Sequence, residues 1–148
     1  MIQYDRRCES TGMTTPQEAL TKAVDSWNSG NLDGYLQLYD EGIKLHGYSP
    51  EPMDKQEVRG FYEATFAAFG APQLEFHETL WDGSACAIRF TLSGTHVGEW
   101  IGVPATGKAV AVPGITILHF DGDQVIERWS QADLLGFLVQ VGAVPAPA

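Results

Sequence analysis

The amino-acid sequence predicts a single α+β domain in which three helices accompany a curled antiparallel or mixed sheet and a short helix ends the chain. Two patterns carry this prediction. Apolar residues recur at helical spacing in the first half of the chain, whereas the second half holds long runs of β-branched and aromatic residues separated by Asp-Gly turns. Because helices and strands are largely segregated, we expect the helices to pack on the concave face of the sheet.

The first two helices are predicted near the start of the chain. Thr15 and Glu18 form a capping box around Pro16, and apolar residues then recur at helical spacing until Gly30. A short second helix is expected over residues 32–40, where leucines and tyrosines share one face.

A second capping box, formed by Asp54 and Glu57, opens the third helix, which is expected to stop at Gly70. Its apolar stripe is typical of core packing, and the alternative is that some of its aromatic side chains line a ligand cavity. The stripe consists of Val58, Phe61, Tyr62, Thr65, Phe66 and Phe69. A last helix is predicted over residues 134–141, introduced by Asp133.

Five strands are predicted from alternation, β-branched composition and Asp-Gly turns. They span residues 43–48, 73–81, 84–95, 109–120 and 125–130. The loop of residues 97–108 carries Trp100, Ile101 and Val103 beside three glycines and one proline, so it does not continue either neighbouring strand. Because this loop is too apolar to be freely solvated, we expect it to cover a pocket, with Trp100 closing the mouth.

Length and composition bound the domain organisation. With 148 residues and 44% hydrophobic content, the chain suits one domain. We expect this domain over residues 13–142, a disordered extension over 1–12 and a tail over 143–148. Cys8 and Cys86 form no CxxC motif, so a structural disulfide is not expected.

The charge of the chain restricts its partners. The formal net charge of −10 argues against nucleic acid and anionic membranes, because phosphate backbones are bound by clustered Lys and Arg. No apolar run is long enough to span a bilayer, and the start lacks the layout of a signal peptide. A cytoplasmic location is therefore expected.

No local motif supports metal, nucleotide or covalent chemistry. His46, His77, His96 and His119 stand apart, without an HxH, HExxH or CxxC motif, so neither a metal nor another cofactor is expected. His96 follows a Gly-Thr pair at the end of a strand and is either a structural turn residue or a pocket residue.

Three charged residues are candidates for a site. Arg89 and Arg128 lie within predicted strands, and each either binds an anionic or enolate oxygen or pairs with a glutamate of a neighbouring strand. Arg128 lies two residues before Ser130, so strand alternation puts both on one face. Asp133 stands where a helix starts and acts either as its N-cap or in catalysis.

A series of motifs follows in a fixed order: GlyThrHisValGly at 94–98, GlyValProAlaThrGly at 102–107, HisPheAspGly at 119–122, Trp129, Asp133 and GlnValGly at 140–142. In these motifs the chain resembles the SnoaL-like polyketide cyclase, or ester cyclase, group of the nuclear-transport-factor-like α+β cone superfamily. The resemblance runs from about residue 16 to residue 142. It implies a curved sheet around the long helix and a deep apolar pocket in which enzymes of the group work by proton transfer.

The resemblance also implies roles for particular residues. His46 is similar in position to a substrate-binding polar residue of the cyclases. It lies on the strand face opposite Ile43 and Leu45, so we predict that it points into the pocket as a base, the alternative being a structural histidine. The acid/base Asp of the cyclases corresponds to Ser130, and the His that supports it corresponds to Ile115. Both departures put the aldol-cyclase mechanism in question, although not the fold.

The predicted site combines catalytic candidates with pocket residues. The catalytic candidates are His46, Asp133 and Arg128. The predicted substrate-pocket residues are Trp27, Phe61, Trp100, Ile115, Ile117 and Ser130.

One function hypothesis and two alternatives follow. The first is cofactor-independent isomerisation or cyclisation, by proton transfer, of an apolar, carbonyl-bearing small molecule. The second is a non-catalytic small-molecule-binding module or dimeric scaffold of the same fold, which Ser130 and Ile115 favour. The third is epoxide opening by water, as in limonene-epoxide-hydrolase-like relatives, which needs an Asp–Arg–Asp set that the strand positions do not supply. Because the long strands are apolar on both faces, we also expect a homodimer formed through the outer sheet face.

Overall fold

The chain follows the predicted order of two helices, a strand, a helix, four strands and a last helix. The computed structural model describes residues 14–147, so the extension predicted over 1–12 lies outside the described residues. The elements are α2 (Pro16–Asn28), α3 (Leu32–Leu36), β1 (Tyr39–His46), α4 (Lys55–Phe69), β2 (Gln73–Asp82), β3 (Ala85–Thr95), β4 (Ala109–Asp121), β5 (Gln124–Ala132) and α5 (Leu134–Gln140). None of these described helices is long and apolar enough to cross a membrane.

Both predicted capping boxes are formed. The Thr15 hydroxyl accepts a hydrogen bond from the Glu18 N–H, and the Glu18 carboxylate accepts one from the Thr15 N–H. Asp54 and Glu57 make the same reciprocal pair at the start of α4. These bonds satisfy backbone N–H groups that the helices leave free, which is why α2 and α4 begin where the sequence predicts.

The second helix is shorter than predicted. It ends at Leu36 rather than at Asp40, because Tyr39 already belongs to β1. The carbonyl of Leu38 accepts a hydrogen bond of 2.8 Å from the Val125 N–H, and Tyr39 pairs with Val125 in β5. Pairing with a strand far along the chain therefore overrides the local helical pattern.

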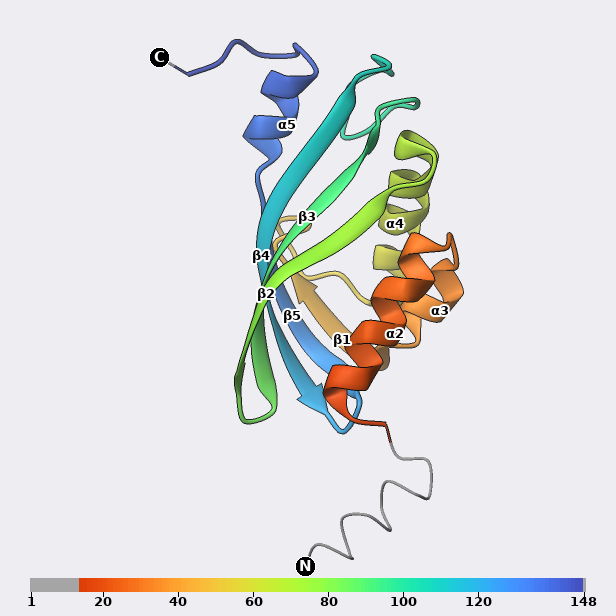
Figure 1. Ribbon diagram of the computed structural model, residues 1–148, viewed down its shortest axis with the longest axis vertical. Coiled ribbons are helices and arrows are strands. Elements are labelled where there is room, and N and C mark those ends of the chain that lie inside the picture. Colours follow the sequence, from red (N-terminus) through yellow and green to blue (C-terminus); the bar gives the residue numbers. More distant parts are fainter. Residues whose placement is uncertain (1–13, 148) are drawn as a thin grey trace, which may run out of the picture.

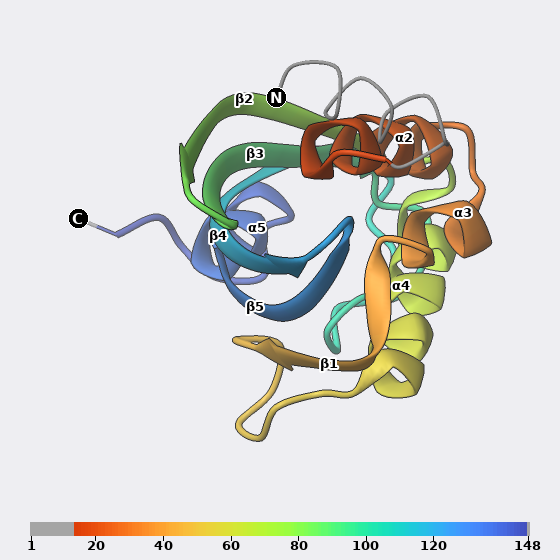
Figure 2. The ribbon, with the colours of Figure 1, turned by 90° about the horizontal axis from the view of Figure 1, so that it is seen from below.

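The five strands form one mixed, open sheet in the order β1-β5-β4-β3-β2. β1 runs parallel to β5, and all other neighbours are antiparallel. Register shifts in three of the four pairings add to the normal twist and curl the sheet. Figures 1 and 2 show the strands arching around the helices, with α2 beside β2 at one edge and α4 beside β1 at the other.

Two groups of buried side chains fill the space between the helices and the sheet. The larger one joins α2, α3 and α4 to the inner faces of the strands. The smaller one joins the end of α4, the loop after β3, β4 and α5, and it includes Phe69, Trp100 and Phe137. Phe61 of α4 packs against both groups and so lies where they meet.

Candidate functional site

A cavity of about 180 Å³ opens between the concave face of the sheet and α2, α3 and α4. Its lining includes buried residues such as Trp27 and Tyr35, and also exposed residues such as Ile101 and Leu134. The exposed members belong to the segment after β1, the loop after β3, the end of β5 and the start of α5. These segments therefore form the mouth, and the helices and the inner sheet face form the floor.

Four of the predicted pocket residues line this cavity: Trp27, Phe61, Trp100 and Ser130. Trp100 belongs to the wall rather than to the mouth, since it is only 5% exposed and its indole N–H donates to the Thr65 hydroxyl at 3.2 Å. The mouth residue of the same loop is Ile101, which is 42% exposed and has a φ of 44°.

The prediction that Ile115 and Ile117 line the pocket is wrong. β4 alternates strictly between exposed and buried residues, and its inward side chains include Val112, Thr116 and Leu118. Ile115 and Ile117 are 57% and 43% exposed on the opposite, outer face. The sequence is apolar on both faces of this strand, so the periodicity alone does not indicate which face is concave.

Arg128 lies on the inner face of β5 and is 8% exposed. It is the one charged residue among the described residues that line the cavity. Its Nε donates to the Thr116 hydroxyl at 2.8 Å. Its Nη1, whose two N–H groups are shared among three acceptors, lies within hydrogen-bond distance of the hydroxyls of Tyr35 at 2.9 Å, Tyr62 at 3.2 Å and Tyr39. None of the ion pairs within residues 14–147 includes Arg128. All the protein groups that accept its hydrogen bonds are neutral hydroxyls.

Four tyrosine hydroxyls form a chain beside Arg128. The oxygen distances are 3.3 Å for Tyr35–Tyr39, 2.7 Å for Tyr39–Tyr62 and 2.8 Å for Tyr62–Tyr48. Four hydroxyl protons serve these three hydrogen bonds, so one proton is left to donate outside the chain. Tyr48 is half-buried and lines the cavity, and the Arg128 guanidinium lies 5.8 Å from its ring centre.

Burial and neighbouring groups determine the protonation states of the tyrosine chain and Arg128. Burial raises the pKa of Tyr39 and Tyr62 well above its ordinary value, and it also raises the pKa of Tyr48, so all three are phenols at neutral pH. Burial alone would lower the pKa of Arg128, but the tyrosine oxygens around it raise that pKa above its ordinary value. The cavity therefore presents hydrogen-bond donors and one positive charge.

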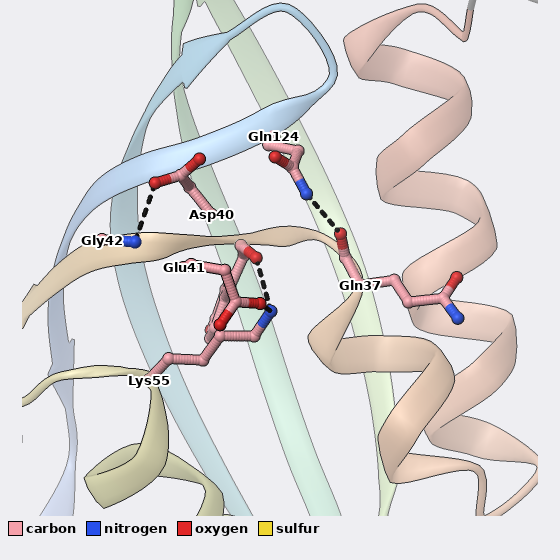
Figure 3. Close-up of polar contacts among 7 residues, drawn as sticks. Gln37, Asp40, Glu41, Gly42, Lys55 and Gln124 are labelled. Atoms are coloured by element: carbon pink, nitrogen blue, oxygen red, sulfur yellow. Dashed lines mark hydrogen bonds and ion pairs between the residues drawn. The ribbon is translucent and has the colours of Figure 1, made fainter.

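Contacts at the start of β1 position Tyr39. The Lys55 ammonium group reaches back from α4 and donates to the Tyr39 carbonyl at 2.9 Å and to the Glu41 carboxylate at 2.8 Å (Figure 3). The Asp40 carboxylate accepts from the Gly42 N–H at 2.8 Å within the irregular segment at the start of this strand. The Tyr39 side chain is fully buried, and its hydroxyl meets the Arg128 guanidinium.

The prediction that His46 points into the pocket is wrong. His46 lies on the outer sheet face, where its Nε2 is 2.8 Å from a Glu127 carboxylate oxygen. Its ring stacks on Trp129, with 4.9 Å between the ring centres and 10° between the planes. The strand face opposite Ile43 and Leu45 is thus the outer one, because those two residues belong to the buried core.

The remaining candidates have structural contacts. The Asp133 carboxylate caps α5 by accepting from the Gly136 N–H at 2.8 Å. Arg89 lies 3.5 Å from Glu78 across the β2–β3 pair, outside the cavity. His96 is fully buried, and its Nδ1 is 3.0 Å from the Thr106 hydroxyl, so it holds the loop after β3. Within residues 14–147 no group of three or more His, Cys, Asp or Glu side chains is placed to hold a metal ion.

The tyrosine chain is a part of the site that the sequence alone did not reveal. Tyr35, Tyr39, Tyr48 and Tyr62 come from α3, β1, the segment after β1, and α4, so no local motif joins them. One signal was present, since four of the five tyrosines in the chain fall within residues 35–62. This clustering in the sequence acquires a meaning only in the folded protein, where Arg128 lies next to the tyrosine hydroxyls.

Comparisons with known proteins agree with this architecture. The family model described as SnoaL-like polyketide cyclase matches residues 17–141. The aklanonic acid methyl ester cyclase DnrD of Streptomyces peucetius is 25% identical over 138 residues, which cover 88% of this chain and 92% of that protein.

Solved structures show the same fold. AclR, a putative hydroxylase from Streptomyces galilaeus, superposes with a TM-score of 0.80 at 25% identity and covers 88% of this chain and 97% of its own. IdmH, a putative polyketide cyclase from Streptomyces antibioticus, has a TM-score of 0.75 at 23% identity and covers 87% of this chain and 99% of its own. Because the family model spans most of the sequence, the chain belongs to the SnoaL-like polyketide cyclase family.

Proposed function

We propose that this protein binds an apolar, carbonyl-bearing small molecule in the cavity and catalyses its cyclisation or isomerisation without a cofactor. The observation that carries the proposal is the position of Arg128, a buried cation in a cavity whose walls are mostly aromatic and aliphatic. Membership of a cyclase family supports the reaction class. One similar protein is a cyclase of aklanonic acid methyl ester.

The chemistry requires stabilisation of a developing oxyanion. In an aldol-type cyclisation, the enol carbon forms a bond to a carbonyl carbon while the carbonyl π bond breaks, so negative charge develops on that oxygen. The Arg128 guanidinium and the spare hydroxyl proton of the tyrosine chain stabilise this charge in a site of low dielectric. The enol proton passes to the new alkoxide, so the product is an isomer of the substrate and no oxidant or reductant is needed.

The lining residues also restrict the substrate. Ser130, Thr65 and Gln131 are the neutral polar residues of the lining besides the tyrosines, and no described lining residue is a carboxylate or an imidazole. A serine or threonine hydroxyl does not act as a base without a partner. The proposal therefore gives Arg128 the role of electrophile and favours substrates that enolise readily by themselves, such as 1,3-dicarbonyl compounds.

The second candidate is a non-catalytic binding protein. The observation that favours it is the same lack of a carboxylate or imidazole among the described lining residues, because proton transfer at neutral pH usually uses one of these groups. The two candidates share the ligand site and differ in turnover.

Ketonisation of the enol of benzoylacetone separates the two candidates. We expect the protein to accelerate the loss of the enol absorbance. We expect Arg128→Met to reduce that acceleration by about 100-fold, the typical effect of removing one oxyanion donor. Arg89→Met is the matched control, since it removes the same charge from the exposed outer face, and it should leave the rate unchanged.

Two results would contradict the proposed reaction. A wild-type rate equal to that of buffer, with the diketone still bound, would favour the binding protein. Loss of turnover in His46→Ala would move the chemistry to the outer face, where His46 pairs with Glu127.

A further inference from the structure

We propose that the ligand of the cavity is a carbonyl-bearing molecule with one apolar ring and one anionic group, a carboxylate or a stable enolate. This inference rests on the same cavity as the proposed function and narrows its substrate class. Three features carry it: the size of the cavity, the missing counter-charge of Arg128 and the free donors at the floor.

The cavity volume limits the ligand to about one ring. The cavity measures about 180 Å³. An apolar protein cavity of about 150 Å³ accommodates benzene, whereas pockets for drug-sized ligands measure roughly 300–1,000 Å³. A ring with one small polar substituent therefore fills the space, whereas a compound of three or four fused rings would extend through the mouth into solvent.

The charge at the floor calls for an anion. A buried cation is costly unless an opposite charge compensates it. Arg59 and Arg89 have such partners, at 2.8 Å from Asp33 and 3.5 Å from Glu78. Arg128 is more deeply buried than either, and no ion pair among the described residues includes it. The tyrosine hydroxyls satisfy its hydrogen bonds but carry no negative charge, so a bound anion is the missing counter-charge.

The donors that remain free match one anionic group. Nε and Nη1 of Arg128 donate to protein oxygens, and within residues 14–147 its Nη2 has no hydrogen-bond partner. The tyrosine chain has one further proton to donate, and Tyr48 is its half-buried member in the lining. Phe61 and Phe90 supply aromatic wall for the ring. An anionic head at Arg128 with its ring toward the mouth satisfies all of these groups.

Isothermal titration calorimetry with three probes tests the inference. Benzoate is the single-ring anion, benzamide its neutral counterpart of similar shape, and anthracenecarboxylate the three-ring anion. We expect benzoate to bind at least about tenfold more tightly than benzamide, because a hydrogen bond between two charged groups is stronger than one to a neutral amide, and we expect anthracenecarboxylate to bind more weakly than benzoate.

Variants of Arg128 and Arg89 test whether Arg128 is the cause of the preference for benzoate over benzamide. Arg128→Met should remove the preference for benzoate over benzamide, and the matched Arg89→Met should keep it. If Arg128→Met does not fold, Tyr48→Phe takes its place, since it removes a donor from the edge of the cluster, and it should reduce the preference. Equal binding of benzoate and benzamide, tighter binding of anthracenecarboxylate than of benzoate, or no binding of benzoate would each overturn the inference.

The outcomes for ligand and reaction are separable. Preferential benzoate binding without accelerated ketonisation of benzoylacetone would leave the anion site standing and contradict the proposed reaction. Accelerated ketonisation with equal binding of benzoate and benzamide would support the proposed reaction and contradict the anion site.

Discussion

Tyr39, Tyr48 and Tyr62 link the site to the stability of the protein. Burial raises the pKa of each phenol above the ordinary value of 10.0, so the folded state keeps protons that the unfolded state releases as the pH passes about 10. Burial likewise raises the pKa of the Cys86 thiol from 9.0 to about 11. For raised pKa values, the contribution to stability is complete below the unfolded-state pKa and is lost as the pH rises.

We therefore predict a loss of stability in alkali. The free energy of unfolding, measured by urea denaturation at pH 8, 9, 10 and 11, should fall from pH 9 onward and more steeply above pH 10. Cys86→Ala should remove the part between pH 9 and pH 10, and Tyr62→Phe should reduce the part above pH 10. A free energy that stays constant up to pH 11 would show that these groups are not buried as described.

The sequence predicted correctly how some side chains of the site are oriented, but not others. Arg128 and Ser130 share the inner face, as alternation in β5 requires. His46 was assigned to the wrong face, because alternation gives the relative orientation of neighbours and not which face is concave. The tyrosine chain depends on contacts between residues far apart in the sequence, such as Tyr35 and Arg128, and these are set by tertiary packing.

Two glycines show how the elements are joined. Gly47 follows β1 with a φ of 96°, and a Cβ atom there would lie 2.0 Å from the Ser130 carbonyl oxygen of β5. Gly60 lies exposed within α4, and a Cβ atom there would meet nothing within 4 Å. The same substitution should therefore have opposite effects at the two positions.

We predict that Gly47→Ala lowers the free energy of unfolding by more than about 2 kcal/mol, since it adds backbone strain and a clash at the rim of the cavity. Gly60→Ala should raise it by about 0.5–1 kcal/mol, because alanine is the better helix former. Chemical denaturation of both variants measures the two values. A Gly47→Ala protein as stable as the wild type would mean that β1 and β5 are not in close contact at this point.

The elements themselves were largely predictable from local signals. The capping boxes fixed the starts of α2 and α4, and the Asp-Gly turns separated the strands. The extent of α3 was not predictable, because the pairing of Tyr39 with Val125 decides where β1 begins. Sequence patterns thus predict helices and strands that are bounded by local caps and turns. Where pairing with a strand far along the chain sets a helix or strand boundary, the boundary is known only from the folded structure.

The whole molecule exposes an apolar band on its outer sheet face. The band crosses neighbouring strands, since Leu80 pairs with Ala87, Ala87 with Ile117, and Ile117 with Trp129. Leu80, Ile117 and Trp129 are all exposed. Monomeric proteins rarely expose a large contiguous apolar patch, so this band supports the proposal that two copies associate through the outer face.

We predict that the protein sediments as a dimer at micromolar concentration. Ile117→Lys should shift it to a monomer that keeps the circular dichroism spectrum of the folded protein, because the side chain lies at the surface of each copy. Leu135→Lys is the matched control, since Leu135 is also a surface residue, 53% exposed against 43% for Ile117, but lies on α5, and this variant should remain dimeric. A monomeric wild-type protein in analytical ultracentrifugation would contradict this proposal.

Arg128 is the proposed anion site at the floor of the cavity, and the proposed function and the proposed ligand both depend on it. The crystal structure of the complex with benzoate tests this most directly. We predict a carboxylate oxygen within hydrogen-bond distance of Arg128 Nη2, with the ring against Phe61 and Phe90. Benzoate bound on the outer face, or an Arg128 guanidinium paired with a protein carboxylate in the presence of benzoate, would contradict the account.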